Sequence, residues 1–263
     1  MHFCPMILQS TSYFESLPAR VISLVPSQTE LLFHLGLSGE VIGITKFCVH
    51  PSQWRKEKNL IGGTKNPNLD RIISLSPSLI IANFEENRKE DIEALATLFP
   101  VWITDVFNLE SALQMIGDLG ELLHKGREAE NLQREIREKQ TQNSRMLRNK
   151  EFISVAYLIW KKPYMTLGGD TFIHAMLHEA KFRNVFGEEK RYPQISLSDP
   201  RLACADLILL STEPYPFSEK DREEIKIIFP NKKVILADGE MFSWFGSRLR
   251  EAFPYLTSLR NQL

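Results

Sequence analysis

Cysteine is scarce in this sequence: Cys4, Cys48 and Cys204 lie far apart in a chain of 263 residues. An odd and sparse set of cysteines argues against a disulfide-stabilised scaffold. An excess of one charge is also missing, because 32 Lys and Arg residues face 33 Asp and Glu residues. The basic residues are scattered rather than gathered into a stripe, so we expect no binding to nucleic acid or to anionic lipid.

Long hydrophobic runs are absent as well. No stretch approaches the roughly 20 apolar residues of a transmembrane helix, so we expect a chain that does not span a membrane. The beginning, MHFCPMILQSTSYFESLPARV, has neither a basic start nor an apolar core long enough for a signal peptide. We therefore expect a cytoplasmic protein as the sequence stands, and a periplasmic one if an export signal has been removed.

What the sequence does contain is an alternation of apolar, β-branched segments with helix-forming segments. This alternation is typical of α/β folds with mostly parallel sheets. Strands are predicted at residues 20–25, 40–45, 78–83, 101–106, 151–160, 206–211 and 232–238. Ser27 and Glu30 follow the first strand with the spacing of a capping box, which predicts that a helix begins there.

The two halves share the same order of segments, so we expect two three-layer α/β lobes. The expected organisation is an N-terminal extension (1–19), an N-terminal lobe (20–107), a connecting helix (108–149) and a C-terminal lobe (150–263). The connecting segment has no proline and is rich in helix formers, which favours one continuous helix of up to ~60 Å. The alternative is a helix–turn–helix that breaks near Gly117, Gly120 or Gly126.

Ligands of open parallel sheets collect beyond the carboxyl ends of the strands, so the segments that follow strands are the candidate site. Several of these loops carry aromatic side chains, which suggests a wall for a flat apolar ligand. The alternative is that the same aromatic residues pack inward. The candidate ligand-binding residues are Phe47, Cys48, His50, Gly63, Thr64, Asn83, Trp160, Tyr164, Gly168, Gly169, Tyr215, Phe242 and Trp244.

A metal site built by the chain alone is not expected. Cys48 and His50 in the segment KFCVHP are suitable metal ligands, but no third and fourth ligand is evident. Cys48 is alternatively a small buried residue, the commoner state of a free cysteine. His174 and His178 have helical i, i+4 spacing, again without a third ligand. Catalytic motifs such as G-x-S-x-G and Cys-x-x-Cys are absent, and no catalytic residue is expected.

The order of these motifs resembles a known family. The segments RVISLVPSQTELLFHLGLSGEVIGIT and IGGTKNPNLDRIISLSPSLIIAN carry the resemblance in the first lobe, and YLIWKKPYMTLGGDTFIHAML, EPYPF and DGEMFSWFGSRL carry it in the second. They are similar to class III periplasmic binding proteins, the helical-backbone metal receptors. This family includes the cobalamin-, heme- and ferric-siderophore-binding components of ABC importers. The resemblance extends from about residue 19 to 260.

The resemblance implies two α/β lobes joined by one long backbone helix, and non-enzymatic binding of a corrinoid, heme or ferric siderophore in an interlobe cleft. No intrinsic cofactor is implied, and we expect a monomer. His50 is a possible axial ligand to the chelated metal. Importer members dock an acidic residue of each lobe onto arginines of the permease. The matching positions are Glu86 and Glu90 in the first lobe and Glu213 and Glu219 in the second.

Two other functions stay open at this point. The first is a cytosolic tetrapyrrole- or metal-handling enzyme that uses the same cleft, with Glu86, Glu213, Glu240 and His50 as acid–base candidates. Convergence of these side chains with strongly shifted pKa values would favour this reading. The second is a partner-docking protein whose cleft is vestigial and filled by its own aromatic side chains.

Overall fold

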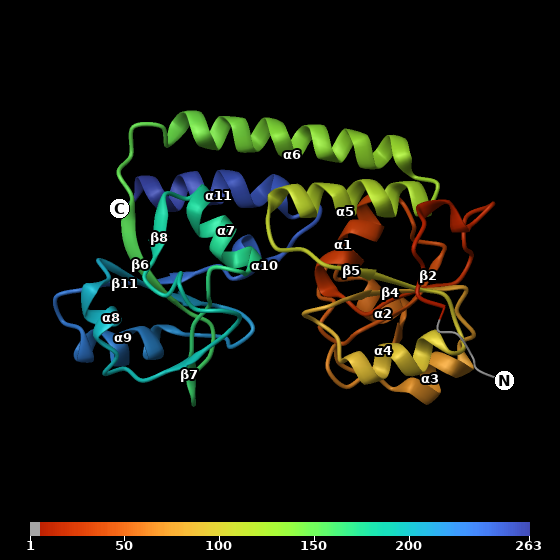
Figure 1. Cartoon of the computed structure of the whole chain (residues 1–263), viewed down its shortest axis with the longest axis horizontal. Helices are drawn as coiled ribbons and strands as arrows, with labels where there is room; N and C mark the ends of the chain where they lie inside the picture. Colours follow the sequence, from red (N-terminus) through yellow and green to blue (C-terminus); the bar gives the residue numbers. More distant parts are fainter. Residues whose placement is uncertain (1–5) are drawn as a thin grey trace. The chain divides into compact units, whose positions relative to one another are not determined.

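The computed structural model describes residues 6–263, so Cys4 and the first part of the expected N-terminal extension lie outside the described residues. The chain divides into two compact units. Unit 1 comprises residues up to Val106, Glu110–Glu135 and Phe245–Arg248, and unit 2 comprises Phe107–Leu109, Ile136–Trp244 and Leu249–Leu263. Each unit is an α/β body built on its own parallel sheet, which confirms the predicted fold class (Figure 1).

Unit 1 contains a five-stranded parallel sheet in the order β3-β2-β1-β4-β5. Its strands are β1 (Val21–Ser23), β2 (Val41–Ile44), β3 (Asn59–Leu60), β4 (Leu79–Asn83) and β5 (Val101–Thr104). The sequence predicted all of them except β3, which is too short to give a pattern. The chain also pairs with β5 before β1 begins, because the Leu8 N–H donates to the Val101 carbonyl at 2.9 Å. A single 3-10 turn, η1 (Thr11–Tyr13), follows that pairing.

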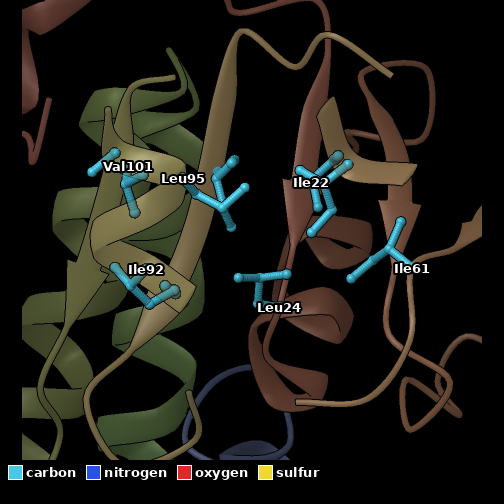
Figure 2. Close-up of a cluster of buried hydrophobic side chains, with 10 residues drawn as sticks. Ile22, Leu24, Ile61, Ile92, Leu95 and Val101 are labelled. Carbon is cyan, nitrogen blue, oxygen red and sulfur yellow. The ribbon is translucent and has the colours of Figure 1, made fainter. Parts of the chain in front are cut away.

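Helices cover both faces of this sheet (Figure 1). The first four are α1 (Pro26–His34), α2 (Trp54–Glu57), α3 (Leu69–Ser74) and α4 (Lys89–Ala96). Figure 2 shows the core under α4, where Ile92 and Leu95 lie with Ile22 and Leu24 of the β1 segment. All four side chains are almost fully buried, so this apolar layer fixes α4 on the sheet.

The start of α1 differs from the capping-box prediction. Pro26 is the first residue of the helix and Val25 is its N-cap, without a side-chain cap hydrogen bond. Proline suits this position, since it has the helical φ and lacks only an N–H that would have no partner in the helix. Ser27 therefore lies inside the first turn instead of capping it, and Glu30 binds Arg248. The predicted capping box is wrong.

The connecting segment forms two helices, α5 (Leu109–Leu122) and α6 (Gly126–Met146). The continuous helix expected over residues 108–149 is therefore wrong, and the helix–turn–helix alternative is confirmed. At the break, His124 has a left-handed φ of 52° and the Lys125 N–H donates to the Gly120 carbonyl at 2.6 Å. The helices pack closely here, because a Cβ on Gly120 would lie 2.3 Å from the Cβ of Ala129.

The single long helix shared by the two units is α6. Its residues up to Glu135 belong to unit 1, and those from Ile136 onward belong to unit 2. With 21 residues, α6 is about 30 Å long. A long helix with residues in both units is thus present, over Gly126–Met146 instead of the expected 108–149.

Unit 2 contains a four-stranded parallel sheet in the order β11-β10-β6-β8. Its strands are β6 (Ile153–Leu158), β8 (Phe182–Asn184), β10 (Leu207–Ser211) and β11 (Lys233–Ala237). A separate antiparallel pair joins β7 (Tyr164–Met165) and β9 (Gln194–Ile195). The sequence missed β8, because its three residues include an exposed arginine and an asparagine and show no strand pattern.

Helices cover both faces of the second sheet as well (Figure 1). They are α7 (Phe172–Glu179), α8 (Pro200–Cys204), α9 (Glu219–Ile228), α10 (Glu240–Ser243) and α11 (Leu249–Asn261). Leu202 of α8 and Ile225 of α9 pack in the core with Leu158 and Ile208. On the opposite face Tyr157 packs edge-on against Phe242 of α10, with ring centroids 5.1 Å apart. Among residues 6–263 no helix is long and apolar enough to cross a membrane.

The unit boundaries depart from the expected ones at Phe245–Arg248. These four residues belong to unit 1, although the residues before and after them belong to unit 2. The expected C-terminal lobe at 150–263 is therefore interrupted by a segment that packs in unit 1. Arg248 of this segment forms an ion pair with Glu30 of α1.

Candidate functional site

All five strands of the unit 1 sheet run parallel, so their carboxyl ends lie along one edge. We call this edge, with the segments that follow β1, β2, β3 and β4, the unit 1 carboxyl edge. Two aromatic side chains are exposed there: Phe47 after β2 is 50% exposed and Phe84 after β4 is 66% exposed. Phe84 was not among the predicted ligand-binding residues, although its place directly after a buried strand was a usable signal.

Phe47 lies over a glycine turn. A Cβ on Gly63 would lie 3.2 Å from Cε2 of Phe47, so the ring rests on the Gly63 backbone. Gly62 beside it has a φ of +98°, a conformation that favours glycine, and its carbonyl accepts the Lys46 N–H at 2.8 Å. The structure thus brings the predicted residues Phe47 and Gly63 together at the unit 1 carboxyl edge. Thr64 follows, and its carbonyl accepts from the Asn87 side chain at 3.1 Å.

Cys48 lies beneath this surface. Its side chain has no exposed area, and Sγ is 3.0 Å from Oγ1 of Thr29 and 3.2 Å from Oγ1 of Thr45. Burial raises the pKa of the Cys48 thiol, and the two threonine hydroxyls oppose that rise. The structure agrees with the alternative for Cys48, a small buried residue, and its ligand contact stays a prediction. His50, two residues on, is half-buried in the same loop.

Asn83 organises the edge instead of facing outward. Its side chain is buried, its Nδ2 donates to the Thr104 carbonyl at 3.0 Å, and its Oδ1 accepts the Glu85 N–H at 2.9 Å. Asn87 bonds to Asn83 in turn: Oδ1 of Asn87 accepts the Asn83 backbone N–H at 2.8 Å. These bonds fix the turn that presents Phe84. Direct ligand contact by Asn83 stays a prediction.

Gln28 and Thr104 complete a buried polar network that the sequence reading missed. Nε2 of Gln28 donates to Oγ1 of Thr104, which also accepts from Nδ2 of Asn83 at 3.1 Å. Thr104 in turn donates to the Ala82 carbonyl at 3.1 Å. The available signal was the position of Gln28, shortly after the apolar strand RVISLV and at the predicted start of a helix. The Gln28 side chain is completely buried, and that burial depends on contacts with residues that are distant in the sequence.

The sheet of unit 2 has a carboxyl edge of its own, formed by the segments after β6, β10 and β11. Trp160 follows β6 and is 39% exposed. It meets Tyr215, which follows β10, edge to face with ring centroids 5.8 Å apart. Tyr215 also packs on Phe217 at 4.8 Å. The structure therefore brings Trp160 and Tyr215, two predicted ligand-binding residues, together at the unit 2 carboxyl edge.

Ion pairs hold the loop that follows Trp160. Nζ of Lys161 lies 2.6 Å from both Asp221 and Glu224 of α9, and its side chain is 11% exposed. Burial works against ionisation of Asp221, but the bonds from Lys161 and Ser218 prevail and lower its pKa to about 2. Tyr164 in β7 is half-buried, and burial raises the pKa of its hydroxyl.

Gly168 and Gly169 serve close packing within unit 2. A Cβ on Gly168 would lie 2.1 Å from the Glu189 carbonyl oxygen, and a Cβ on Gly169 would lie 2.2 Å from that of Gly187. The Gly169 N–H donates to the Glu189 carbonyl at 3.0 Å. These contacts leave no room for a side chain at either position, which explains why both residues are glycine without invoking a ligand. Ligand contact at Gly168 and Gly169 stays a prediction.

Glu213 joins the loops after β10 and β11. Its carboxylate accepts from Oγ of Ser243 and from Nε1 of Trp244, the latter at 3.2 Å. Burial raises the pKa of Glu213, while the Ser243 and Trp244 bonds oppose the rise and the charge of Glu240 adds to it. Gly239 leaves room for this arrangement, because a Cβ there would lie 2.4 Å from Cγ of Glu213. Trp244 itself is buried, as is Phe242.

The candidate docking residues differ in exposure. The Glu90 side chain in α4 is 74% exposed and that of Glu219 in α9 is 65% exposed. Glu213 is mostly buried and bonded within unit 2, so exposure favours Glu219 over Glu213 as the docking residue of that unit. Glu86 is partly buried, which favours Glu90 in unit 1.

A hollow of about 920 Å³ lies elsewhere in unit 2, beside the edge strand β8. Its walls include His174 and His178 of α7 and Cys204 of α8. Burial lowers the pKa of His174, and the neighbouring His178 adds to this effect. Within residues 6–263 no group of three or more His, Cys, Asp or Glu side chains is placed to hold a metal ion. None of the residues predicted to bind ligand lines the hollow, although Gly187 in its wall packs against Gly169.

Comparison with known proteins places the chain in a family. Residues 21–226 match the sequence profile described as periplasmic binding protein. The chain belongs to this family. A relative, the vitamin B12-binding protein of Vibrio campbellii, is 25% identical over 195 residues, which are 73% of this chain and 70% of that protein. The family resemblance stated from the sequence is thereby confirmed.

Solved structures show the same fold. The periplasmic vitamin B12 binding protein BtuF of Vibrio cholerae superposes with a TM-score of 0.77 at 19% identity, covering 93% of this chain and 97% of that one. The periplasmic heme-binding protein RhuT from Roseiflexus sp. RS-1, in apo form, superposes with a TM-score of 0.78 at 19% identity, covering 93% and 98%. At 19% identity, these superpositions show that the chain shares the fold of the two proteins.

Proposed function

We propose that the chain is a non-enzymatic binding protein for a metal chelate of the corrinoid, heme or ferric-siderophore class. The observation that carries the proposal is the set of exposed aromatic side chains at the carboxyl edges, Phe47 and Phe84 in unit 1 and Trp160 in unit 2. Exposed aromatic faces suit flat, largely apolar ligands, and strand carboxyl ends are where ligands of parallel sheets bind. Membership in the periplasmic binding protein family supports the same function.

The chelate would bring its own metal. Cys48 is buried, so His50 is the remaining metal-ligating side chain of the KFCVHP segment that is partly exposed. We propose His50 as an axial ligand to the chelated metal, which an imidazole nitrogen suits. A His50→Ala variant would then shift the absorption bands of the bound chelate. Unchanged bands would show that His50 does not bind the metal and only packs against the chelate.

The enzyme alternative rested on convergence of acidic side chains with His50. Glu213 has a raised pKa and Glu240 lies close enough to affect it. However, both oxygens of Glu213 accept hydrogen bonds from Ser243 and Trp244 of the same unit. Burial therefore accounts for the raised pKa of Glu213, its hydrogen bonds give it a structural role within unit 2, and binding is the function that the site supports best.

Docking to an importer permease is a further part of the proposal. Glu90 and Glu219 are the exposed acidic candidates, each near the beginning of a helix that packs on its sheet. Exposed carboxylates on α4 and α9 would pair with arginines of a permease. A Glu90→Gln, Glu219→Gln double variant would bind the chelate normally and lose affinity for the permease.

The direct test of the binding function is titration of the full chain with cyanocobalamin, hemin and a ferric siderophore. Quenching of tryptophan emission and a change in the ligand spectrum are expected for at least one of them, because Trp160 lies at the proposed site. Absence of both signals with all three classes would contradict the proposal.

A further inference from the structure

Two segments of unit 2 meet at its carboxyl edge. The Trp160 turn, residues 159–165, leads from β6 into β7, and the Tyr215 segment, residues 213–221, leads from β10 into α9. The rings of Trp160 and Tyr215 meet edge to face at 5.8 Å. The backbone bond between the segments is long, because the Tyr215 N–H lies 3.4 Å from the Ile159 carbonyl. Neither contact is strong enough to fix the Trp160 ring in one place.

Backbone bonds close the Trp160 turn within itself. The Met165 N–H donates to the Trp160 carbonyl at 3.2 Å, and the Ile159 N–H donates to the Met165 carbonyl at 2.9 Å. These bonds give the turn its shape, but both partners of each bond belong to the turn. The position of the turn relative to the Tyr215 segment therefore depends on other contacts.

Lys161, the residue directly after Trp160, supplies the strong link. Its Nζ lies 2.6 Å from Oδ1 of Asp221 and 2.6 Å from Oε2 of Glu224, both in α9. The side chains of Lys161 and Asp221 are largely buried, so salt in the solvent screens this pair little. Oδ2 of Asp221 accepts from the Ser218 N–H at 2.9 Å and from the Ser218 hydroxyl at 2.6 Å, which fixes Asp221 at the beginning of α9.

A buried ion pair such as Lys161–Asp221 fixes geometry more than it adds to stability. Taking two charges out of water costs about as much free energy as their attraction supplies, so an apolar replacement of similar size is often equally stable. An apolar side chain lacks direction, however, whereas an ammonium group bonded to two carboxylates has one favourable position. The ion pairs of Lys161 therefore hold the neighbouring Trp160 in register with the Tyr215 segment.

We propose that Lys161 is a positioning residue of the chelate site, an inference that rests on the proposed chelate-binding function. Lys161 bonds to α9 and not to the ligand, and its ion pairs keep the partly exposed Trp160 ring against Tyr215 before the ligand arrives. A side chain that is already ordered loses less conformational freedom on binding, which raises the affinity. Lys161 thus contributes to affinity through Trp160.

A double-mutant cycle separates this role from a general effect on the fold. The ligand is whichever of cyanocobalamin, hemin and ferrichrome binds the wild-type chain most tightly. Lys161→Met removes the ion pairs and is expected to weaken binding about fivefold in the wild-type background, but less than about twofold in a Trp160→Leu background. Lys89→Met breaks an exposed ion pair in α4 and serves as the control, with unchanged affinity.

Near-ultraviolet circular dichroism follows the Trp160–Tyr215 contact without any ligand. The signal of the contact is the part of the spectrum that Trp160→Leu removes, and Lys161→Met is expected to lose most of it with an unchanged far-ultraviolet spectrum. If Lys161→Met does not fold, its combination with Asp221→Asn takes its place in both measurements. The asparagine keeps an oxygen for Ser218 and leaves no unpaired carboxylate at that position.

Equal effects of Lys161→Met on affinity in the wild-type and Trp160→Leu backgrounds would show that Lys161 does not act through Trp160. That result, or an unchanged near-ultraviolet signal in Lys161→Met, overturns this inference alone. Binding of none of the three chelates by the wild-type chain overturns the proposed function, and the inference with it.

Discussion

Arg248 binds both carboxylate oxygens of Glu30: Nη2 lies 2.6 Å from Oε1 and Nε lies 3.1 Å from Oε2. The two side chains are only 9% and 17% exposed. This two-point ion pair joins α1 to the segment Phe245–Arg248, which belongs to unit 1 although its flanking residues belong to unit 2. The pair is one of the contacts that hold this segment in unit 1, together with the packing of Gly246 on α1.

Breaking the Arg248–Glu30 pair should destabilise the protein strongly. Glu30→Gln leaves a largely buried guanidinium without its charged partner, which typically costs about 3–5 kcal/mol. Glu93→Gln is the control, because its ion pair with Lys89 is exposed and such pairs contribute about 0–1 kcal/mol. Urea unfolding would measure both variants. Equal stabilities of Glu30→Gln and Glu93→Gln would show that the buried pair contributes no more than a surface pair.

Two glycines near the turn between α5 and α6 should respond to alanine substitution in opposite ways. Gly120→Ala places a Cβ 2.3 Å from that of Ala129, so we expect destabilisation of about 1–3 kcal/mol despite the better helix propensity of alanine. Gly126→Ala has no atom within 4 Å of the new Cβ and should be neutral or stabilise by up to about 1 kcal/mol. Thermal unfolding of the two variants checks the contrast. A stabilising Gly120→Ala would contradict the close packing of α5 on α6.

Cys48 should be chemically inert in the folded protein. In a Cys4→Ser background, a thiol reagent is expected to modify Cys204, which is exposed, and to reach Cys48 only on unfolding. The buried thiol has a raised pKa, so little thiolate is present at neutral pH. A Cys4→Ser, Cys204→Ser variant provides the control, with no reactive thiol in the native state. Labelling of Cys48 at the rate of Cys204 would refute its burial.

The predicted strands were confirmed where a segment carried a long, consistent apolar pattern. The run DLILLS became β10, because a continuous apolar stretch is buried from both faces in a parallel sheet. Short or polar strands such as β3 (Asn59–Leu60) gave no such pattern. The break between α5 and α6 depended on the contact of Gly120 with Ala129, which only the packed structure shows.

The sequence predicted which loops form the candidate site, but it did not predict which of their side chains are exposed. Trp160 and Tyr215 were expected after strands, and the structure pairs them there. Cys48 and Phe242 were expected in the same kind of position, yet both are fully buried. Which way a loop side chain turns depends on neighbours from distant segments, as Tyr157 and Tyr255 are for Phe242.

The central claim is that aromatic side chains at the carboxyl edges hold the chelate, and two residues that flank β6 test it most directly. Trp160 follows the strand and is 39% exposed, while Phe152 precedes it and is 38% exposed. The measurement is the dissociation constant of the tightest-binding chelate for Trp160→Leu and Phe152→Leu. We expect a loss of about tenfold or more for Trp160→Leu and a change within about twofold for Phe152→Leu. Equal affinities of the two variants would contradict the account.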